Sequence, residues 1–139
     1  MAFLDSSVLV ASLDPDDAAH AACSHLVAAG GHHAYSHALA EVFSALTGGR
    51  LSRRLTPAVA AGLIEDSVLP YVAVQTLSAK ELIAALRDCG PRGARGGAVY
   101  DWLHLAAARK AGATEFYTLN LRDFQALARP GDPLVRLPH

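Results

Sequence analysis

The sequence is poor in cysteine and has no long hydrophobic run. Its two cysteines, Cys23 and Cys89, are too few and too far apart in the chain for a disulfide framework or a zinc site. We therefore expect two reduced thiols, as is usual for a cytosolic protein. No apolar run approaches the roughly 18 residues that cross a membrane, and the first residues, MAFLDSSVLV, lack the basic leader of a signal peptide. These absences predict a cytoplasmic protein with no membrane partner.

The chain also lacks a strong net charge. With 12 Lys and Arg against 13 Asp and Glu, its formal net charge is −1, which argues against a protein that coats nucleic acid through bulk positive charge. The charge leaves local contact with phosphate open, because arginine binds phosphate in a bidentate manner better than lysine does. The arginines are grouped in the sequence, although ordinary solvated surface is the simpler interpretation of each one. The two groups are Arg50, Arg53 and Arg54, and Arg87, Arg92 and Arg95.

Short apolar segments alternate with helical patterns along the whole chain. Strands are predicted near 2–5, 32–35, 71–74, 115–118 and 134–137, and helices near 15–29, 38–47, 57–67, 79–88, 122–128 and around residue 101. Such alternation is typical of a parallel sheet covered by helices on both faces. With 52% hydrophobic residues and no dividing linker, residues 1–139 are predicted to form a single α/β domain. Its parallel sheet should have four or five strands flanked by helices.

Turn and capping residues separate these elements. Ser6 and Ser7 are predicted to make a turn after the first strand. Asp14 and Pro15 are predicted to begin the following helix, as its N-cap and its first helical residue. Ser36 is predicted to cap the helix after the second strand. The glycine-rich segment 90–97 is expected to be a flexible connector.

One predicted helix carries an acid in an apolar setting. Asp101 lies in AVYDWLHLAAARKAGA, which is apolar on nearly every face of its first turns and is therefore expected to be buried. A lone buried carboxylate costs on the order of several kcal/mol of desolvation. It should therefore be protonated or be compensated by a cation. A buried arginine or His104, three residues further along the same face, is one candidate for that cation.

Further polar residues are expected at one edge of the sheet, because parallel α/β sheets bind ligands beyond the carboxyl ends of their strands. Asp5 ends the first strand, and Glu41 lies in the second turn of the helix after the second strand. Asn120 and Asp123 follow the strand at 115–118. Carboxylates that meet there repel one another, so without a metal at least one pKa should rise. Oxygen ligands without His or Cys at metal spacing suit Mg²⁺ or Mn²⁺, which predicts metal-assisted hydrolysis of a phosphodiester.

Four segments of the sequence resemble those of one protein family. The start FLDSSVLV, the acid in ALAEVFSAL, the acid in AVYDWLHLAAARKAGA and the block FYTLNLRDF occur in the order and at the spacing of PIN-domain ribonucleases. Each segment alone is a weak signal, whereas four in order within one short chain are fairly specific. Over essentially its whole length the chain is similar to PIN domains, and in particular to the VapC toxins of bacterial toxin–antitoxin pairs.

The resemblance implies a three-layer PIN-like fold and Mg²⁺-dependent endonucleolytic cleavage of RNA, with Mn²⁺ as an alternative metal. It further implies a homodimeric toxin that is neutralised by a small cognate antitoxin. Asp5, Glu41 and Asp101 match the three best-defined acids of the family, which are catalytic and bind the metal. Asp123 matches the acid of the last motif, and Asn120 stands where some PIN domains have aspartate. Either of these two would be the fourth ligand.

Supporting residues and partner surfaces can also be predicted. Ser7 matches a small polar residue that orients the first acid of PIN domains, and Thr118 would act in the same way. Arginines within 50–54 or 87–95 would bind phosphates that flank the scissile bond. Apolar helix surface within 51–71 is the expected face for a second subunit or an antitoxin. A pocket crowded with carboxylates should also attract a cationic side chain, such as an antitoxin arginine.

Simpler interpretations of the same residues remain. Asp5 would merely cap a turn, Glu41 would be a solvated helix residue, and Asp123 would be favoured by the helix dipole. His37 is assigned to the surface or to the edge of the sheet. Tyr100 is assigned to the core or to an interface, and His104, when it is not the partner of Asp101, to packing or orientation.

Other functional classes fit the sequence less well. Phosphotransferases of the haloacid-dehalogenase type need a second aspartate two residues after the first, where this chain has Ser7. A receiver domain needs a lysine after a late strand, and neither Lys80 nor Lys110 stands in such a place. A catalytically inactive PIN-like scaffold that binds RNA or protein is the remaining alternative. It ranks below an active nuclease because all four acids are present.

Overall fold

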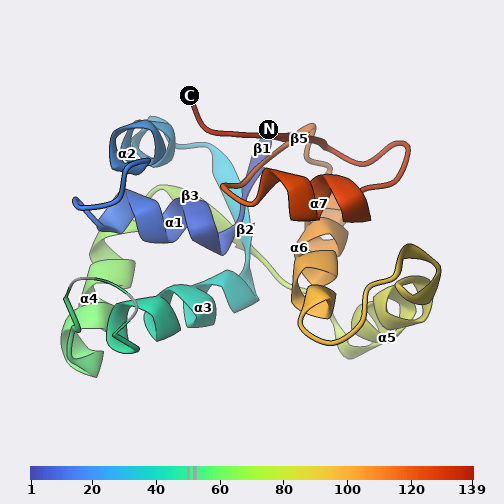
Figure 1. The fold of residues 1–139 in the computed structure, drawn as a ribbon, viewed down its shortest axis with the longest axis horizontal. Helices are drawn as coiled ribbons and strands as arrows, with labels where there is room; N and C mark the ends of the chain where they lie inside the picture. Colours follow the sequence, from blue (N-terminus) through green and yellow to red (C-terminus); the bar gives the residue numbers. More distant parts are fainter. Residues whose placement is uncertain (50, 52) are drawn as a thin grey trace.

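A single parallel sheet forms the centre of the molecule (Figure 1). The computed structural model describes residues 1–49, 51 and 53–139, so the expected phosphate contact of Arg50 lies outside the described residues. Within them the sheet has five strands in the order β3-β2-β1-β4-β5, and each neighbouring pair is parallel. The strands are β1 (Ala2–Leu4), β2 (His32–Tyr35), β3 (Val72–Gln75), β4 (Glu115–Tyr117) and β5 (Leu134–Arg136). The predicted parallel α/β fold is confirmed.

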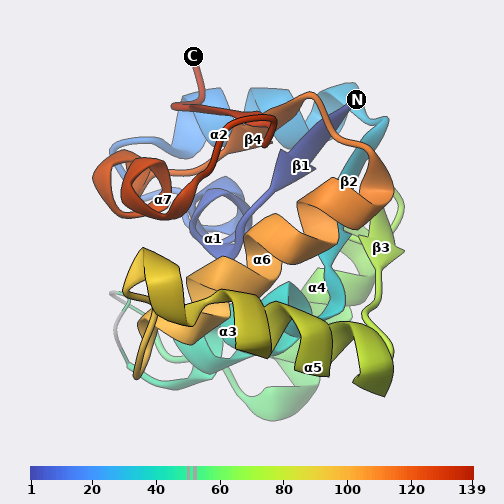
Figure 2. The same cartoon turned by 90° about the vertical axis from the view of Figure 1, so that its right-hand side faces the viewer.

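Helices cover both faces of this sheet, as Figures 1 and 2 show from two sides. One layer holds α1 (Ser6–Leu13), α2 (His20–Ala29), α3 (Ser36–Thr47) and α4 (Pro57–Ser67). The other holds α5 (Ala79–Asp88), the short 3-10 helix η1 (Gly90–Arg92), α6 (Ala98–Ala111) and α7 (Leu121–Leu127). Side chains alternate along β1: Ala2 and Leu4 pack in the core under the first layer, and Phe3 packs in the core under the second. The two hydrophobic cores therefore lie back to back across the sheet.

The prediction for residues 6–19 was wrong. Ser6 and Ser7 do not make a turn but open α1, which follows β1 directly, with Asp5 as its N-cap. Asp14 and Pro15 do not begin a helix, because two aspartates form local turns instead: Asp14 accepts from the Asp16 N–H at 3.1 Å and Asp17 from the Ala19 N–H at 2.8 Å. The following helix, α2, starts only at His20. The predicted cap Ser36 is likewise the first residue of α3, whose N-cap is Tyr35.

The helix that carries Asp101 is anchored by its next residue. Trp102 is fully buried, and its indole N–H donates to the carbonyl of Ala85 in α5 at 2.8 Å. The guanidinium of Arg109 lies 5.0 Å from the Trp102 ring centroid and binds both carboxylate oxygens of Asp132 at 3.0 Å. These contacts tie α6 to α5 and to the segment before β5. They fix where the first turn of α6 stands relative to the sheet.

The strand order creates a crevice next to β1. The chain proceeds from β1 to β2 on one side, while β4 lies on the other side. Such a switch point opens beyond the carboxyl ends of the strands and is where α/β sheets commonly bind ligands. Among the described residues, no helix has the length and apolar character needed to cross a membrane.

Candidate active site

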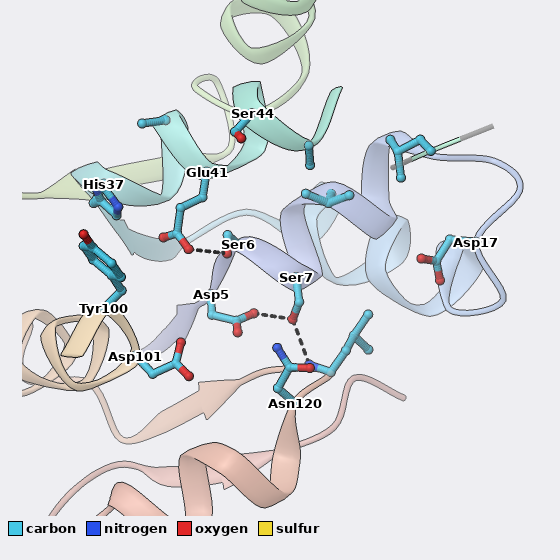
Figure 3. A pocket seen from close by; sticks show the side chains of 15 residues that line it. Asp5, Ser6, Ser7, Asp17, His37, Glu41, Ser44, Tyr100, Asp101 and Asn120 are labelled. Carbon is cyan, nitrogen blue, oxygen red and sulfur yellow. Dashed lines mark hydrogen bonds between the residues drawn. The ribbon is translucent and has the colours of Figure 1, made fainter. Parts of the chain in front are cut away.

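A pocket of about 730 Å³ lies at this switch point (Figure 3). Its walls come from the start of α1, from α3, from the first turn of α6 and from the segment after β4. Five residues that the sequence analysis selected line it. They are Asp5, Ser7, Glu41, Asp101 and Asn120.

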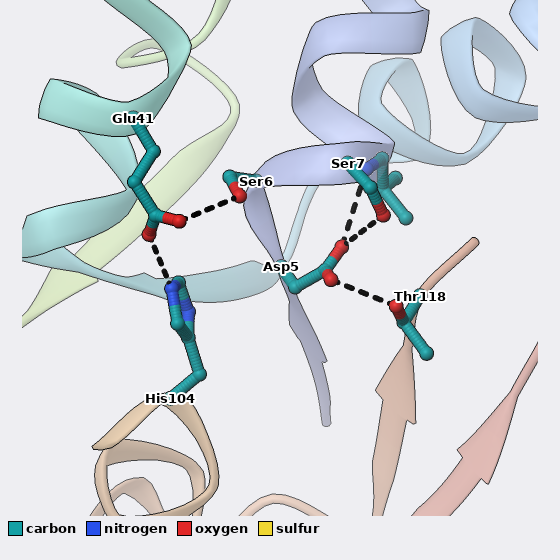
Figure 4. A network of polar contacts seen from close by, with 7 residues as sticks. Asp5, Ser6, Ser7, Glu41, His104 and Thr118 are labelled. Atoms are coloured by element: carbon teal, nitrogen blue, oxygen red, sulfur yellow. Dashed lines mark hydrogen bonds and ion pairs between the residues drawn. The ribbon is translucent and has the colours of Figure 1, made fainter. Parts of the chain in front are cut away.

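Asp5 is held rigidly at the centre of the sheet edge (Figure 4). Its side chain is almost fully buried. One carboxylate oxygen accepts from the Ser7 hydroxyl at 2.6 Å and from the Val8 N–H at 3.3 Å, and the other accepts from the Thr118 hydroxyl at 2.7 Å. Asp5 thus caps helix α1, and not a turn as the simpler interpretation had it, and it also lines the pocket.

Ser7 and Thr118 connect Asp5 to the segment that follows β4. The Ser7 hydroxyl also accepts from the Leu119 N–H at 3.0 Å, and the Thr118 hydroxyl accepts from the Asn120 N–H at 2.9 Å. Each hydroxyl therefore donates to the carboxylate and accepts from a backbone amide. These hydrogen bonds fix the position of the Asp5 carboxylate relative to the segment after β4.

Glu41 projects from α3 and is held by two donors (Figure 4). His104 Nε2 donates to its Oε1 at 2.5 Å, and the Ser6 hydroxyl donates to its Oε2 at 3.2 Å. His104, which is buried in α6, pairs with Glu41. The sequence analysis considered Asp101 as the partner of His104, and the structure shows Glu41 in that place. No local pattern points to this pair, because 63 positions separate the two residues.

Asp101 stands opposite these residues, in the first turn of α6. It is half-buried and has no hydrogen-bond partner among the residues that the structure describes. His104 acts on Asp101 only through its charge, which lowers the pKa of the Asp101 carboxyl. The apolar helix predicted a carboxylate that is protonated or compensated by a cation; among the described residues Asp101 forms no ion pair or hydrogen bond with such a cation.

The three acids have different electrostatic states. Burial raises the pKa of Asp5 despite its hydrogen bonds. Burial, together with the charges of Asp5, Glu41 and Asp123, raises the pKa of Asp101 to about 6, against the opposing effect of His104. Burial also acts on Glu41, but the hydrogen bond and charge of His104, with help from His37 and Ser6, lower its pKa overall. Negative charge is therefore compensated at Glu41 and left in excess at Asp101.

Asp123 differs from the other predicted acids. It lies in the first turn of α7, is exposed, and is not among the residues that line the pocket. Its charge still reaches Asp101, whose pKa it helps to raise. Asn120, in contrast, lines the pocket, and its side chain does not cap α7. The amide is thus better placed than Asp123 to be a fourth ligand.

Comparison with known families identifies the domain. A sequence model of the PIN domain matches residues 2–130. The chain belongs to the PIN-domain family. A comparison with curated proteins gave no match. Within this PIN domain, the crevice acids Asp5, Glu41 and Asp101 come from the motifs that carried the resemblance in the sequence.

Solved structures share the fold of this PIN domain. VapC20 of Mycobacterium tuberculosis, described as a toxin that cleaves the sarcin–ricin loop, superposes with a TM-score of 0.71 at 24% identity over 96% of this chain and 100% of that one. FitAB bound to the IR36 DNA fragment gives 0.66 at 17% identity over 99% and 95%. VapBC2 of Rickettsia felis, bound to a fragment of its promoter, gives 0.66 at 15% identity over 99% and 98%.

The donor set of this PIN domain fits a hard divalent cation. Asp5, Glu41 and Asp101 offer carboxylate oxygens to the pocket, and Asn120 offers an amide. In the described part of the chain no three His, Cys, Asp or Glu side chains form a ready-made metal cage. Mg²⁺ does not require such a cage, because it binds through one or two carboxylates and keeps several waters. The excess negative charge at Asp101 is what a cation would compensate.

Proposed function

We propose that this PIN domain is a metal-dependent endoribonuclease and the toxin of a bacterial toxin–antitoxin pair. One observation carries the proposal: Asp5, Glu41 and Asp101, from three separate segments, line one pocket at the switch point of the sheet. Parallel sheets bind ligands at this edge. The alternatives based on phosphoryl transfer lose support, since Lys110 binds Glu81 at 2.7 Å and the Thr76 carbonyl and does not line the pocket.

Asp5, Glu41 and Asp101 would hold Mg²⁺ or Mn²⁺, with Asn120 as the fourth ligand. A bound metal would supply Lewis-acid stabilisation of phosphate charge and a water of lowered pKa. The chain itself orients the ligands: Ser7 and Thr118 fix the Asp5 carboxylate in two directions. Such second partners typically decide metal affinity because they fix the ligand orientation.

The substrate we propose is RNA, as in the toxin VapC20. Exposed arginines lie close in the sequence to pocket-lining residues at two places. Leu51 lines the pocket, and Arg53 and Arg54 follow it in the same loop. Arg92 and Arg95 precede α6, whose first turn carries Asp101. These side chains would bind phosphates on either side of the scissile bond and offset the repulsion between RNA and the acids.

We further propose a homodimer and an antitoxin partner, in line with the likeness to VapBC2 and FitAB. A mainly apolar groove of about 230 Å³ lies between α1, α3 and α4 and overlaps the first part of the predicted surface at 51–71. Six apolar side chains line it, next to Asp14 and Arg53. They are Leu13, Leu46, Leu51, Leu55, Val59 and Leu63. Because Leu51 also borders the acidic pocket, a chain bound in this groove can reach the acids.

The test is cleavage of single-stranded RNA by the purified chain with Mg²⁺, with Mn²⁺ and with EDTA. Asp101→Asn should lower the cleavage rate by about 10²–10³-fold, the usual cost of removing one preorganised charge from an active site. Asp66→Asn is the matched control, because Asp66 is an exposed aspartate in α4 outside the pocket. Cleavage that survives EDTA or Asp101→Asn would rule out the metal site. Absence of cleavage by the wild-type chain would favour the inactive scaffold.

A further inference from the structure

Two stacked rings stand at the mouth of the acidic pocket. Tyr100 is 52% exposed although it is a large aromatic residue. Its ring is nearly parallel to that of His37, with 10° between the planes and 5.3 Å between the centroids. Both residues line the pocket beside Glu41 and Asp101 (Figure 3). The nuclease chemistry described above uses neither ring.

The pair is connected to the core by further ring contacts. His37 lies 6.2 Å from Tyr35, which is buried, and Tyr35 meets the edge of His104 at 5.5 Å. Tyr100 is also the residue before Asp101 in the first turn of α6. The orientation of the stack is thus fixed by the same elements that position the acids, which lowers the entropy lost when a third planar group binds.

An exposed aromatic face beside a phosphate-cleaving site suits one ligand in particular. Unpaired bases of single-stranded RNA bind proteins by stacking on Tyr, Phe, Trp or His rings. We propose that Tyr100, backed by His37, stacks with the base of a nucleotide next to the scissile phosphate. This inference rests on the proposed ribonuclease function and adds a base-binding subsite to it.

A protein partner fits this position less well than a base. An apolar side chain placed on Tyr100 would also cover Glu41 and Asp101 and would leave their charges without water. A nucleotide has a planar base for the ring, and its phosphate approaches the acids together with a cation. The mainly apolar groove lined by Leu13, Leu46 and Leu55 is better suited to the apolar side chains of a protein partner.

The experiment couples a ring deletion to a base deletion. A short single-stranded RNA is first cut by the wild-type chain to locate the scissile bond. Two further probes then carry an abasic ribose on one or the other side of that bond. The specificity constant kcat/KM is measured on all three probes for the wild type, Tyr100→Ala and Tyr100→Trp. Ile83→Ala is the control, because Ile83 is an apolar residue of α5 that is about as exposed as Tyr100, at 51%, but lines neither pocket.

We expect Tyr100→Ala to lower kcat/KM on intact RNA by about 5- to 150-fold, the range of one base–aromatic stack. For the wild type, one of the two abasic probes should lower kcat/KM by a similar factor. For Tyr100→Ala, the same probe should lower kcat/KM hardly further. Tyr100→Trp should retain cleavage, and Ile83→Ala should leave it unchanged. If the two fold-changes in kcat/KM, from the ring deletion and from the base deletion, simply multiply, the stacking inference is wrong. The proposed nuclease function is not affected by that result. The stacking inference is also wrong if Tyr100→Ala disrupts dimerisation, measured by sedimentation, and leaves kcat/KM per dimer intact.

A binding measurement separates this inference from the proposed function. If the wild type cuts no RNA, the nuclease proposal fails by itself. The inference is then decided by binding measurements in Ca²⁺. The affinities of the wild type and of Tyr100→Ala are compared for the intact probe and for a probe that is abasic at each position. Base-dependent affinity that disappears in Tyr100→Ala supports the stacking site without cleavage, and equal affinities contradict it.

Discussion

The two walls of the pocket are built differently. We call Asp5 and Glu41 the held wall, because every carboxylate oxygen there accepts a hydrogen bond from the protein. Asp101 and Asn120 form the open wall. Asp101 lacks a hydrogen-bond partner among the described residues, and the Asn120 side chain does not cap its helix. Folding thus provides a hydrogen bond for each carboxylate oxygen of the held wall. Among the described residues, the Asp101 carboxylate of the open wall has none.

The difference indicates how the fold divides its task. Fixed partners hold the Asp5 and Glu41 carboxylates in place, so a metal or phosphate bound there, as proposed, would require little reorganisation of this wall. Asp101 instead carries excess negative charge, and burial and its acidic neighbours raise its pKa to about 6. A bound cation would relieve that charge. The free energy released on the open wall would then contribute to metal affinity.

The largest effect on stability is expected from breaking the held wall at His104. His104→Phe keeps a ring of similar size but removes the donor to Glu41. We expect the free energy of unfolding at pH 7 to fall by about 2 kcal/mol, the usual loss for a hydrogen bond to a charged group. The measurement is urea unfolding. Because the pKa of Glu41 is lowered in the folded state, this loss should shrink as the pH falls below about 4.5.

His104→Gln is the matched variant for this prediction. Its amide N–H can still donate to Glu41, so it should recover part of the lost stability and of the cleavage rate. If His104→Phe is instead as stable as the wild type while His104→Gln is destabilised, ring packing against Tyr35 and Phe124 stabilises the site, and the hydrogen bond does not. The held wall would then owe its position to packing.

How far the sequence predicts this arrangement differs between the walls. Asp5 and Asp101 could be selected because one ends an apolar strand and the other interrupts an apolar helix. The donor to Glu41 could not be selected, because His104 is distant in the chain and pairs with Glu41 only through tertiary packing. The stack of His37 on Tyr100 escaped detection for the same reason. Local patterns thus reveal the acids, whereas their partners depend on the fold.

The elements show the same limit. The strands and α4, α5 and α6 follow from turns, caps and periodicity, and the capping box of Ser78 and Glu81 forms as expected for a helix start. Helix α1 was missed because its sequence, SSVLVASL, has hardly any polar face. It packs between α2 and α3, with Val8, Leu9 and Ala11 buried. A short helix covered on several sides loses the periodic pattern by which helices are recognised.

A smaller effect, of opposite sign, is expected on the open wall. Asp101→Asn should stabilise the metal-free chain by about 1 kcal/mol at pH 7, after allowing for solvent screening of a half-buried group. The sign follows from the raised pKa: between pH 4 and 6 the folded state binds more protons at Asp101 than the unfolded state does. The stability of the wild type therefore falls as the pH rises through that window. Urea unfolding at pH 4 and pH 7 measures it.

The gain in Asp101→Asn should disappear near pH 4, where the wild-type carboxyl is protonated. Mg²⁺ should raise the Tm of the wild type and reduce the difference at pH 7, since the cation binds the folded wild-type chain. The control Asp66→Asn should show no such pH dependence. A gain of equal size at both pH values would mean that Asp101 carries no excess charge, and the contrast between the walls would be lost.

The smallest effect is expected from Asp123, which lies outside both walls. Asp123→Asn removes a charge from the first turn of α7 and should lower the free energy of unfolding by about 0.5 kcal/mol. It should also weaken Mg²⁺ binding only a few-fold, because the charge acts on Asp101 through solvent. Calorimetric titration with Mg²⁺ at low and high salt measures this, and the effect should vanish at high salt. If Asp123→Asn instead abolishes Mg²⁺ binding at every salt concentration, Asp123 is a direct ligand. Helix α7 must then move toward the pocket when the metal binds, and the open wall would include a residue that the metal-free fold keeps outside.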